Sequence, residues 1–230
     1  MRVYEIRLKV FLLKDIYLSQ MQEKCAALID KALLDDPSMQ IFHEQKIYKN
    51  YCAAGLHPIE SDGVYKSGKI YTLMLRTIDE KLKDYFMYVL KNTTTEEMKG
   101  LIAVERPIKK IPLQKIYSLS PVIIKNPEGY WRNCMTLDAY ERRLFENLVK
   151  KYKCFTGKVI DENFDLYTSL QINNEGPIVC KYKNIKLLGD KLTLEISNDV
   201  LAQELSYMAL GTGIGEGNAR GYGFLGYKYL

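Results

Sequence analysis

The chain has 230 residues, of which 47% are hydrophobic and 27% are charged, and its formal net charge is +5. This composition is typical of a globular protein and excludes a largely disordered one. A chain of this length forms one large domain or two domains of about 100 residues each. The positive surplus is modest, and by itself it only favours an acidic or nucleic-acid partner.

No apolar run is long enough to cross a bilayer, and the first residues lack the apolar core of a signal peptide. The cysteines are odd in number, scattered, and form no C-x-x-C pair: Cys25, Cys52, Cys134, Cys154 and Cys180. We therefore expect no disulfide framework, no metal site and no cofactor. We also expect a cytoplasmic protein without a membrane partner.

Six segments of the first half show the spacing of strands or helices. In chain order they are a half-buried strand at 2–13, a helix from Ser19 that stops at Pro37, a hairpin of strands at 47–54 and 69–78, a second amphipathic helix at 79–92, and one or two strands at 100–113. The order β-α-β-β-α-β is that of a ferredoxin-like unit.

The second half repeats a similar order. Its segments are a strand-like stretch at 115–126, a helix at 137–155, strands at 164–172, 178–188 and 191–196, a helix at 197–210, and a last strand within 221–230. Ser197 or Asn198 is expected to cap the last helix, and Gly211 to close it. The sequence thus predicts an α+β fold of two tandem ferredoxin-like (RRM-like) domains, each an antiparallel sheet with two helices. We place them at 1–115 and 116–230.

The last twenty residues, GTGIGEGNARGYGFLGYKYL, hold seven of the fifteen glycines. Residues 221–226 spell G-x-G-x-x-G, but no helix can follow them, so a dinucleotide site is rejected. Residues 63–69 have the spacing of a P-loop, but Ile70 stands where a magnesium-binding hydroxyl is required. The glycines either expose backbone N–H groups to phosphates or only permit tight packing, and both readings stay open.

The pattern G-x-G-x-G-x₅-G-x-G beginning at Gly211, followed by hydrophobic Phe224, resembles the glycine-rich loop of the RAMP superfamily of CRISPR-associated proteins. It is most similar to the repeat-processing endoribonucleases, the sixth Cas family. The resemblance implies a metal-independent endoribonuclease that cleaves CRISPR repeats in precursor crRNA by attack of the 2′-hydroxyl. Its products would carry a 2′,3′-cyclic phosphate or 3′-phosphate and a 5′-hydroxyl. The alternative is a non-catalytic RAMP-type RNA-binding subunit of an interference complex.

The partners implied by this resemblance are repeat RNA, subunits of an interference complex and a second copy of the chain. The implied RNA-binding residues lie in the glycine-rich end and near the domain junction. They are Gly213, Gly215, Gly217, Asn218, Arg220, Gly221 and Gly223, together with Lys109 and Lys110. Basic residues also cluster on the helix at 137–155, where we expect a solvated face or phosphate contacts.

The chain has two histidines, His43 and His57. Metal-free RNA cleavage needs proton transfer at neutral pH, to which histidine is suited. In the family a catalytic histidine follows the first helix, and a basic, aromatic segment leads into the next strand. The resemblance therefore implies a catalytic role for His43, with Lys49 assisting and with Tyr48 and Tyr51 as further candidates. His57 is expected to be structural.

Some members of the family carry a catalytic tyrosine in the first helix. The chain has no counterpart to it, since Cys25, Leu28 and Ile29 occupy that region. The catalytic set is therefore left as His43 alone, His43 with Lys49, or His43 with a tyrosine.

Overall fold

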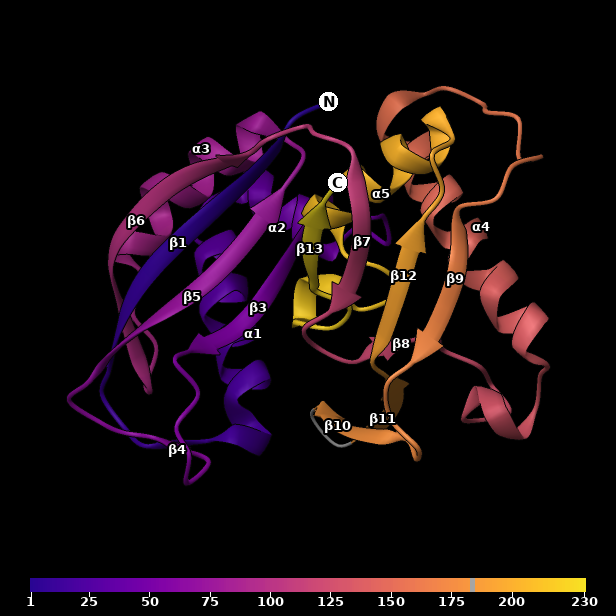
Figure 1. Ribbon diagram of the computed structural model, residues 1–230. Coiled ribbons are helices and arrows are strands. Elements are labelled where there is room, and N and C mark those ends of the chain that lie inside the picture. Colours follow the sequence, from indigo (N-terminus) through magenta and orange to yellow (C-terminus); the bar gives the residue numbers. More distant parts are fainter. Residues whose placement is uncertain (183–184) are drawn as a thin grey trace.

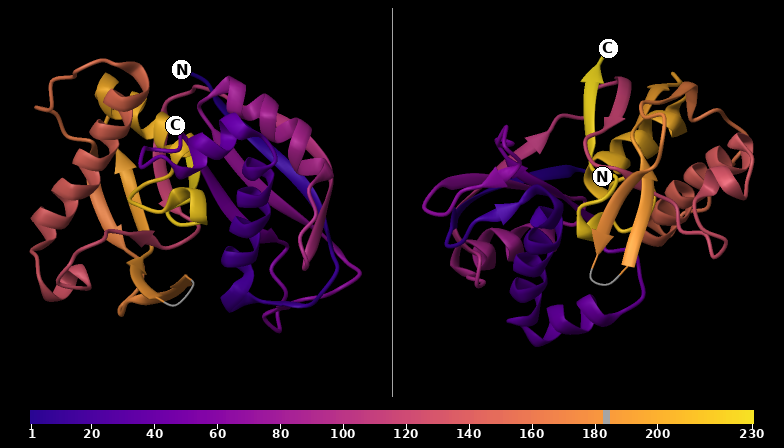
Figure 2. Two further views of the ribbon diagram at one scale, coloured as in Figure 1. Left: turned by 180° about the vertical axis from the view of Figure 1, so that it is seen from behind. Right: turned by 90° about the horizontal axis from the view of Figure 1, so that it is seen from below.

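A computed structural model describes residues 1–182 and 185–230. Two four-stranded antiparallel sheets stand side by side, one in each half of the chain (Figure 1). Seen from behind, the helices of both halves lie in front of their sheets, and the glycine-rich C-terminal segment lies between them (Figure 2). The expected α+β fold of tandem ferredoxin-like units is confirmed.

The first sheet has the spatial order β3-β5-β1-β6, which is that of a ferredoxin-like unit. Its strands are β1 (Val3–Leu12), β3 (Tyr51–His57), β5 (Ile70–Thr77) and β6 (Met98–Ile108), and the helices packed on it are α1 (Leu18–Leu34) and α3 (Glu80–Val89). The short strands β2 (Ile16–Tyr17) and β4 (Val64–Tyr65) pair separately, and the 3-10 turn η1 (Leu90–Asn92) follows α3. The period-two pattern of β1 is real, because Ile6 and Leu8 are fully buried while Arg7 is exposed.

An additional helix, α2 (Pro37–Glu44), follows α1 and was not predicted. Pro37 was expected only to stop the first helix, but it occupies the first turn of α2, where a proline costs no hydrogen bond. The Asp36 side chain caps α2 by accepting hydrogen bonds from two backbone N–H groups of its first turn. His43 consequently lies in the last turn of a helix, and not in a connection after helix one. The expected N-cap at Ser19 is also corrected, since α1 begins at Leu18.

The second sheet has the order β13-β7-β12-β9. Counted along each half, its strands have the same spatial order as those of the first sheet. The elements are β7 (Leu113–Ser118), β9 (Tyr167–Ile172), β12 (Leu192–Ile196) and β13 (Leu225–Tyr229), with helices α4 (Leu137–Thr156) and α5 (Val200–Thr212) and 3-10 turns η2 (Trp131–Asn133) and η3 (Asn218–Arg220).

A third, smaller sheet of order β10-β11-β8 adjoins the second half. It consists of β8 (Val122–Ile123), β10 (Ile178–Tyr182) and β11 (Ile185–Asp190). The sequence predicted one strand over 178–188, whereas β10 and β11 pair antiparallel. Positions 183 and 184 of that prediction lie outside the described residues.

Helix α5 differs from its prediction at both ends. Its N-cap is Asp199, whose carboxylate accepts two hydrogen bonds from the first turn, and not Ser197 or Asn198. At the other end Gly211 lies inside the helix and Gly213, with φ of 74°, is the cap. The glycine-rich segment therefore leaves the helix two residues later than expected.

Strand β6 ends at Ile108 and β7 begins at Leu113, and the two halves of the chain meet in the segment between them. The boundary expected at 115/116 falls inside β7. Helix α5 packs on both sheets. The Tyr207 hydroxyl on α5 accepts a hydrogen bond from the N–H of Val3 at 3.2 Å and donates one to the carbonyl of Ile108 at 2.7 Å.

Arg76 links the two sheets at another point, and a buried ion pair within the first sheet holds its side chain. Glu5 on β1 and Arg76 on β5 are both buried, with their charged groups 2.9 Å apart. Arg76 also donates to the carbonyl oxygen of Leu225 at 2.6 Å and lies 4.4 Å from the centre of the Phe224 ring. Burial alone raises the pKa of Glu5, but the positive charges of Arg76 and Arg7 outweigh it and hold that pKa below its usual 4.5.

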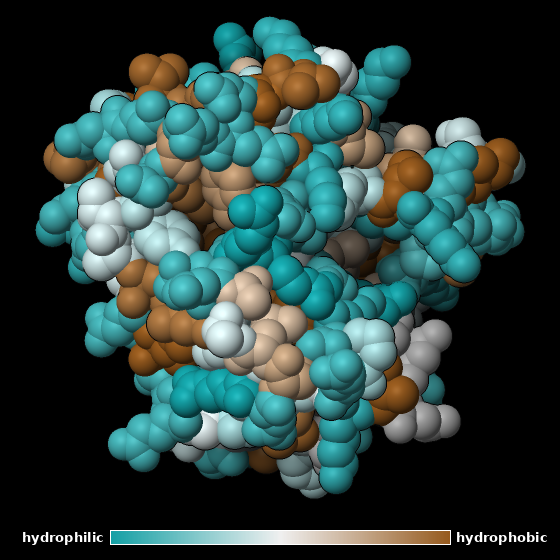
Figure 3. Space-filling model, turned by 90° about the vertical axis from the view of Figure 1, so that its right-hand side faces the viewer, coloured by the Kyte–Doolittle hydropathy of each residue, from teal (hydrophilic) through white to brown (hydrophobic). Residues whose placement is uncertain are grey.

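The side of the molecule that carries α4 and β9 is largely hydrophilic (Figure 3). Arg142, Lys150 and Lys153 on α4 are exposed there, as predicted for a solvated helix face. Lys151 is the exception, because only 4% of it is exposed. Its side chain turns inward, toward the glycine-rich segment.

Candidate functional site

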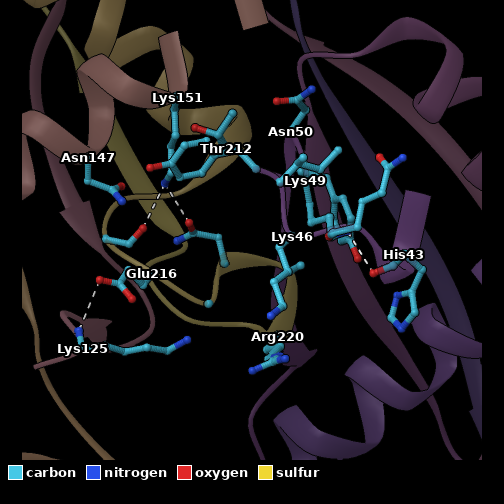
Figure 4. Close-up of a pocket in the computed structure, with 18 of the residues that line it drawn as sticks. His43, Lys46, Lys49, Asn50, Lys125, Asn147, Lys151, Thr212, Glu216 and Arg220 are labelled. Atoms are coloured by element: carbon cyan, nitrogen blue, oxygen red, sulfur yellow. Dashed lines mark hydrogen bonds between the residues drawn. The ribbon is translucent and has the colours of Figure 1, made fainter. Parts of the chain in front are cut away.

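A cavity of about 500 Å³ opens between the two halves on the side where their helices lie. The first half contributes its lining from α1, α2 and the segment that leads into β3, and the second half from α4 and the glycine-rich segment. Figure 4 shows His43, Lys46, Lys49 and Asn50 on one side and Lys125, Asn147, Lys151 and Glu216 on the other. Sequence positions more than 100 residues apart thus form the walls of one site.

His43 lines this cavity from the last turn of α2, and its side chain is 31% exposed. Its Nδ1 atom lies 3.6 Å from an Oδ1 atom of Asp30, which α1 contributes to the same cavity. His57, at the end of β3, is exposed and is not among the residues that line the cavity. The two histidines, close in sequence, therefore lie in different surroundings.

Lys49 closes the C-terminal end of α2. Its ammonium donates hydrogen bonds to the carbonyl oxygen of Phe42, to that of His43 at 2.9 Å, and to that of Gln45 at 2.8 Å. A cation is favoured at this end of a helix, where carbonyl groups point outward. Burial lowers the pKa of Lys49, and the Asp30 carboxylate opposes that shift. Lys49 thus holds the turn that carries His43 and also brings positive charge to the site.

The two tyrosines of the same segment differ in position. Tyr48 is partly exposed, and its pKa is raised by burial and by the negative charge of Glu216. Tyr48 also borders a second cavity of about 270 Å³, which it shares with residues of α4. Tyr51 is only 3% exposed, and its ring meets that of Phe86 edge-on at 5.2 Å. Tyr51 is therefore part of the hydrophobic core of the first half, and burial raises the pKa of its hydroxyl.

The glycine-rich segment is held from beneath by Lys151. The Lys151 ammonium donates to the carbonyl oxygens of Gly213 at 2.8 Å and Gly215 at 3.0 Å, and to Oδ1 of Asn218 at 2.7 Å. These three acceptors match the three N–H bonds of an ammonium. Burial lowers the pKa of Lys151 to about 7, and the negative charge of Glu216 acts in the opposite direction.

Asn218 continues this hydrogen-bond network. Its Nδ2 group donates to the carbonyl oxygens of Ile214 and Tyr222, each at 2.9 Å. Gly223 has a φ of 62°, and a Cβ atom there would lie 1.9 Å from the carbonyl oxygen of Ile214. Glycine is therefore required at this position by both backbone conformation and space. The segment is a fixed loop packed between the halves.

The glycine-rich segment has a buried part and a part that faces the cavity. Gly213, Gly221 and Gly223 are buried and do not line the cavity. The cavity is lined instead by six consecutive residues, Gly215 to Arg220. Gly213, Gly221 and Gly223 thus provide close packing. Of the lining residues, Gly215 and Asn218 are buried as well, whereas Gly217, Ala219 and Arg220 are at least partly exposed.

Cations from both halves line the cavity. They are Lys46, Lys49, Lys125, Lys151 and Arg220, and the imidazole of His43 lies among them. The carboxylates among the lining residues are Asp30, Glu44 and Glu216. Excess positive charge around an open cavity favours a polyanion.

The predicted pair at the domain junction lies elsewhere. Neither Lys109 nor Lys110 lines the cavity. The ammonium of Lys110 pairs with Glu204 and lies 5.7 Å from the centre of the Tyr207 ring. The backbone carbonyl of Lys109 accepts a hydrogen bond from Tyr229.

Among the lining residues that sequence reasoning missed, Asp30, Lys125, Asn147 and the buried Lys151 come from elsewhere in the chain than the two predicted segments. Only Lys151 left a signal in the sequence. It stands three residues after Leu148 and seven after Leu144, on the buried face of α4.

Within residues 1–182 and 185–230, no helix is long and apolar enough to cross a membrane. Among those same residues, no group of three or more histidine, cysteine or acidic side chains could hold a metal ion.

Comparison with known proteins identifies the family. Residues 105–227, more than half of the chain, match the family described as CRISPR associated protein Cas6, C-terminal. The chain belongs to the Cas6 family. The resemblance found in the sequence is thereby confirmed, and the family implies a protein that processes CRISPR RNA. A comparison with curated proteins found no match.

Solved Cas6 structures share the fold along the whole chain. A structure described as CRISPR associated protein Cas6 is 17% identical, covers 98% of this chain and 99% of its own, and has a TM-score of 0.70. A RAMP protein described as binding different RNA substrates is 14% identical with a TM-score of 0.73, over 98% and 99% of the two chains. Thermus thermophilus Cas6 in a product complex is 15% identical with a TM-score of 0.63, over 99% of each chain.

Proposed function

We propose that this Cas6-family protein is a metal-independent endoribonuclease that cuts CRISPR repeats in precursor crRNA. One observation carries the proposal: the cavity places His43 opposite the glycine-rich segment, with cations contributed by both halves. A polynucleotide that crosses this cavity contacts a proton-transfer group on one side and backbone amides with Arg220 on the other. Such an arrangement suits binding and cleavage at a single phosphodiester.

His43 moves the proton in the proposed reaction. The imidazole takes the proton of the 2′-hydroxyl, and the 2′-oxygen attacks the adjacent phosphorus. The new O2′–P bond forms as the P–O5′ bond breaks, and the leaving 5′-oxygen takes up a proton. The products are a 2′,3′-cyclic phosphate and a 5′-hydroxyl. Hydrolysis of the cyclic phosphate then gives a 3′-phosphate.

The neighbouring residues have supporting roles in this proposal. The ammonium groups of Lys46 and Lys49 offset the negative charge that builds up on the phosphorus oxygens. Tyr48 and Tyr51 both border the cavity. The more exposed Tyr48 orients the RNA, and the buried Tyr51 supports the cavity from the core of the first half.

The residues of the glycine-rich segment also have two kinds of role in this proposal. Gly217 and Arg220 contact phosphate, whereas the buried Gly213, Gly215, Gly221 and Gly223 and the Asn218 side chain fix the shape of the loop. Lys109 and Lys110 lie outside the cavity and remain predictions for RNA contacts beyond it. The expected interference-complex subunits and the homodimer also remain predictions.

The test compares wild type, His43→Ala and His57→Ala with labelled repeat RNA in EDTA. We expect site-specific cleavage by wild type and His57→Ala, and a rate lower by about 10²–10⁴-fold in His43→Ala, because a proton-transfer group is lost. A 2′-deoxy nucleotide at the cut site should block cleavage and spare binding. Cleavage that persists at the wild-type rate in His43→Ala would remove His43 from the mechanism. Binding without any cleavage would instead indicate the non-catalytic RNA-binding subunit.

A further inference from the structure

The carboxylate of Asp30 faces the proposed catalytic histidine from a neighbouring helix. We infer that Asp30 is the positioning residue for His43, accepting a hydrogen bond from Nδ1–H so that Nε2 is left to exchange the proton with RNA. The inference rests on the proposed function and names a residue that the sequence motifs did not single out. It concerns how one ring nitrogen is selected for the reaction.

Asp30 lies beside the side chains of the segment that carries His43. Its Oδ1 atom is 3.6 Å from Nδ1 of His43, and both residues line the cavity. The same carboxylate acts electrostatically on Lys49, where it opposes the lowering of the pKa, and on Tyr51, where it adds to the raising of the pKa. Asp30 is thus the common acidic neighbour of His43, Lys49 and Tyr51, three of the four side chains first proposed for catalysis in this segment.

The chemistry requires such a partner. A neutral imidazole carries its proton on one nitrogen and accepts on the other, and the hydrogen bond at one nitrogen decides which is which. A carboxylate at Nδ1 makes that nitrogen the donor and leaves the Nε2 lone pair for the 2′-hydroxyl proton. The carboxylate also stabilises the imidazolium that forms when the proton arrives. At 3.6 Å the two atoms are at ion-pair distance and beyond a hydrogen bond, and contacts between catalytic groups often tighten to hydrogen bonds only when substrate binds.

The first measurement needs no activity. Nitrogen-15 chemical shifts of the two histidines report the tautomer of each ring, with His57 as an internal control outside the cavity. In wild type we expect His43 to be protonated at Nδ1 when neutral. In Asp30→Ala its shifts should move toward those of the Nε2–H tautomer, whereas those of His57 stay unchanged. Identical His43 shifts in wild type and Asp30→Ala would overturn the inference.

The second measurement is single-turnover cleavage of bound repeat RNA. Asp30→Ala is expected to lower the rate by about 10- to 100-fold, as the loss of an orienting partner does elsewhere, with RNA affinity changed less than twofold. Asp30→Glu, which keeps the carboxylate, should recover much of the rate. Glu23→Gln is the matched control, because Glu23 lies on α1 two turns before Asp30 and does not line the cavity.

A double-mutant cycle completes the test. Asp30→Ala should add no further loss to His43→Ala if the aspartate acts through the histidine. Additive losses would show that Asp30 acts on its own and would overturn the inference. If wild type does not cleave, the proposed function fails, and the tautomer measurement still decides whether Asp30 orients the ring.

Discussion

Each of the two walls of the cavity is held by a lysine that donates three hydrogen bonds, but the two lysines lie in different surroundings. Lys49 donates to three carbonyl oxygens at the end of α2, and Lys151 donates to three acceptors of the glycine-rich segment. Helix α2 has no buried residue, whereas most of the glycine-rich segment is buried. Water can therefore replace a lost donor at the first wall but not at the second. The glycine-rich wall is thus held inside the protein, and the wall that carries His43 lies near solvent.

The largest effect is expected from Lys151→Met, which tests this comparison directly. Replacing Lys151 leaves three neutral oxygen acceptors without a donor inside the protein. Each buried unsatisfied acceptor costs about 1–3 kcal/mol, so we expect a loss of about 3–5 kcal/mol in the free energy of unfolding. Lys49→Met is the matched variant and should cost about 1 kcal/mol or less, because its acceptors can bind water. Urea denaturation of both variants measures the difference. Equal losses would mean that burial does not distinguish the two walls.

A smaller effect is expected when the shape of the glycine-rich segment is disturbed. Gly223→Ala puts a Cβ atom 1.9 Å from the Ile214 carbonyl oxygen on a backbone with positive φ. We expect a cost of about 2–3 kcal/mol, from the strained backbone and from the shift needed to relieve the contact. Gly63→Ala is the control, since its φ is 71° but nothing lies within 4 Å of the added atom. It should cost about 1 kcal/mol, and thermal melts of the two variants would reveal no difference if local packing were irrelevant.

The smallest effect is expected at the Glu5–Arg76 ion pair, whose arginine also contacts the second sheet. Because the pKa of Glu5 is lower in the folded protein than in the unfolded chain, its ion pair contributes stability above pH 4.5 that is lost as the pH falls. Glu5→Gln should therefore lower the free energy of unfolding by about 1–2 kcal/mol at pH 7. The gap from wild type should close as the pH falls below 4.5, which urea titrations at several pH values would show. A gap independent of pH would assign the loss to packing.

The fold was predictable because each half repeats clear local patterns. The alternation of Ile6, Arg7 and Leu8 gave β1 its buried and exposed faces, and the order of such segments led to the tandem fold. The prediction failed where one residue has two possible uses. Pro37 can end one helix or begin the next, and Asp36 before it was the capping signal that decides between them.

The site was predictable only on one side. His43 and Lys49 come from a single short segment, so a motif could locate them together. Lys151 binds loop residues more than 60 positions away, and Asp30 meets His43 only because α2 folds back beside α1. Contacts of this kind depend on the packing of helices, which local periodicity does not encode. The role of Lys151 could be suspected from its place on the apolar face of α4, but its partners could not.

The position of Tyr207 bears on how the chain should be divided. Its hydroxyl binds the beginning of β1 and the end of β6, so a helix of the second half completes the ends of the first sheet. Val3, Ile78 and Ile108 of the first half likewise belong to the core cluster of the second. The interactions that stabilise one half are thus partly supplied by the other. The two ferredoxin-like units are separate in topology, but because they share these contacts we expect them to unfold together, and the cavity between them requires both to be folded.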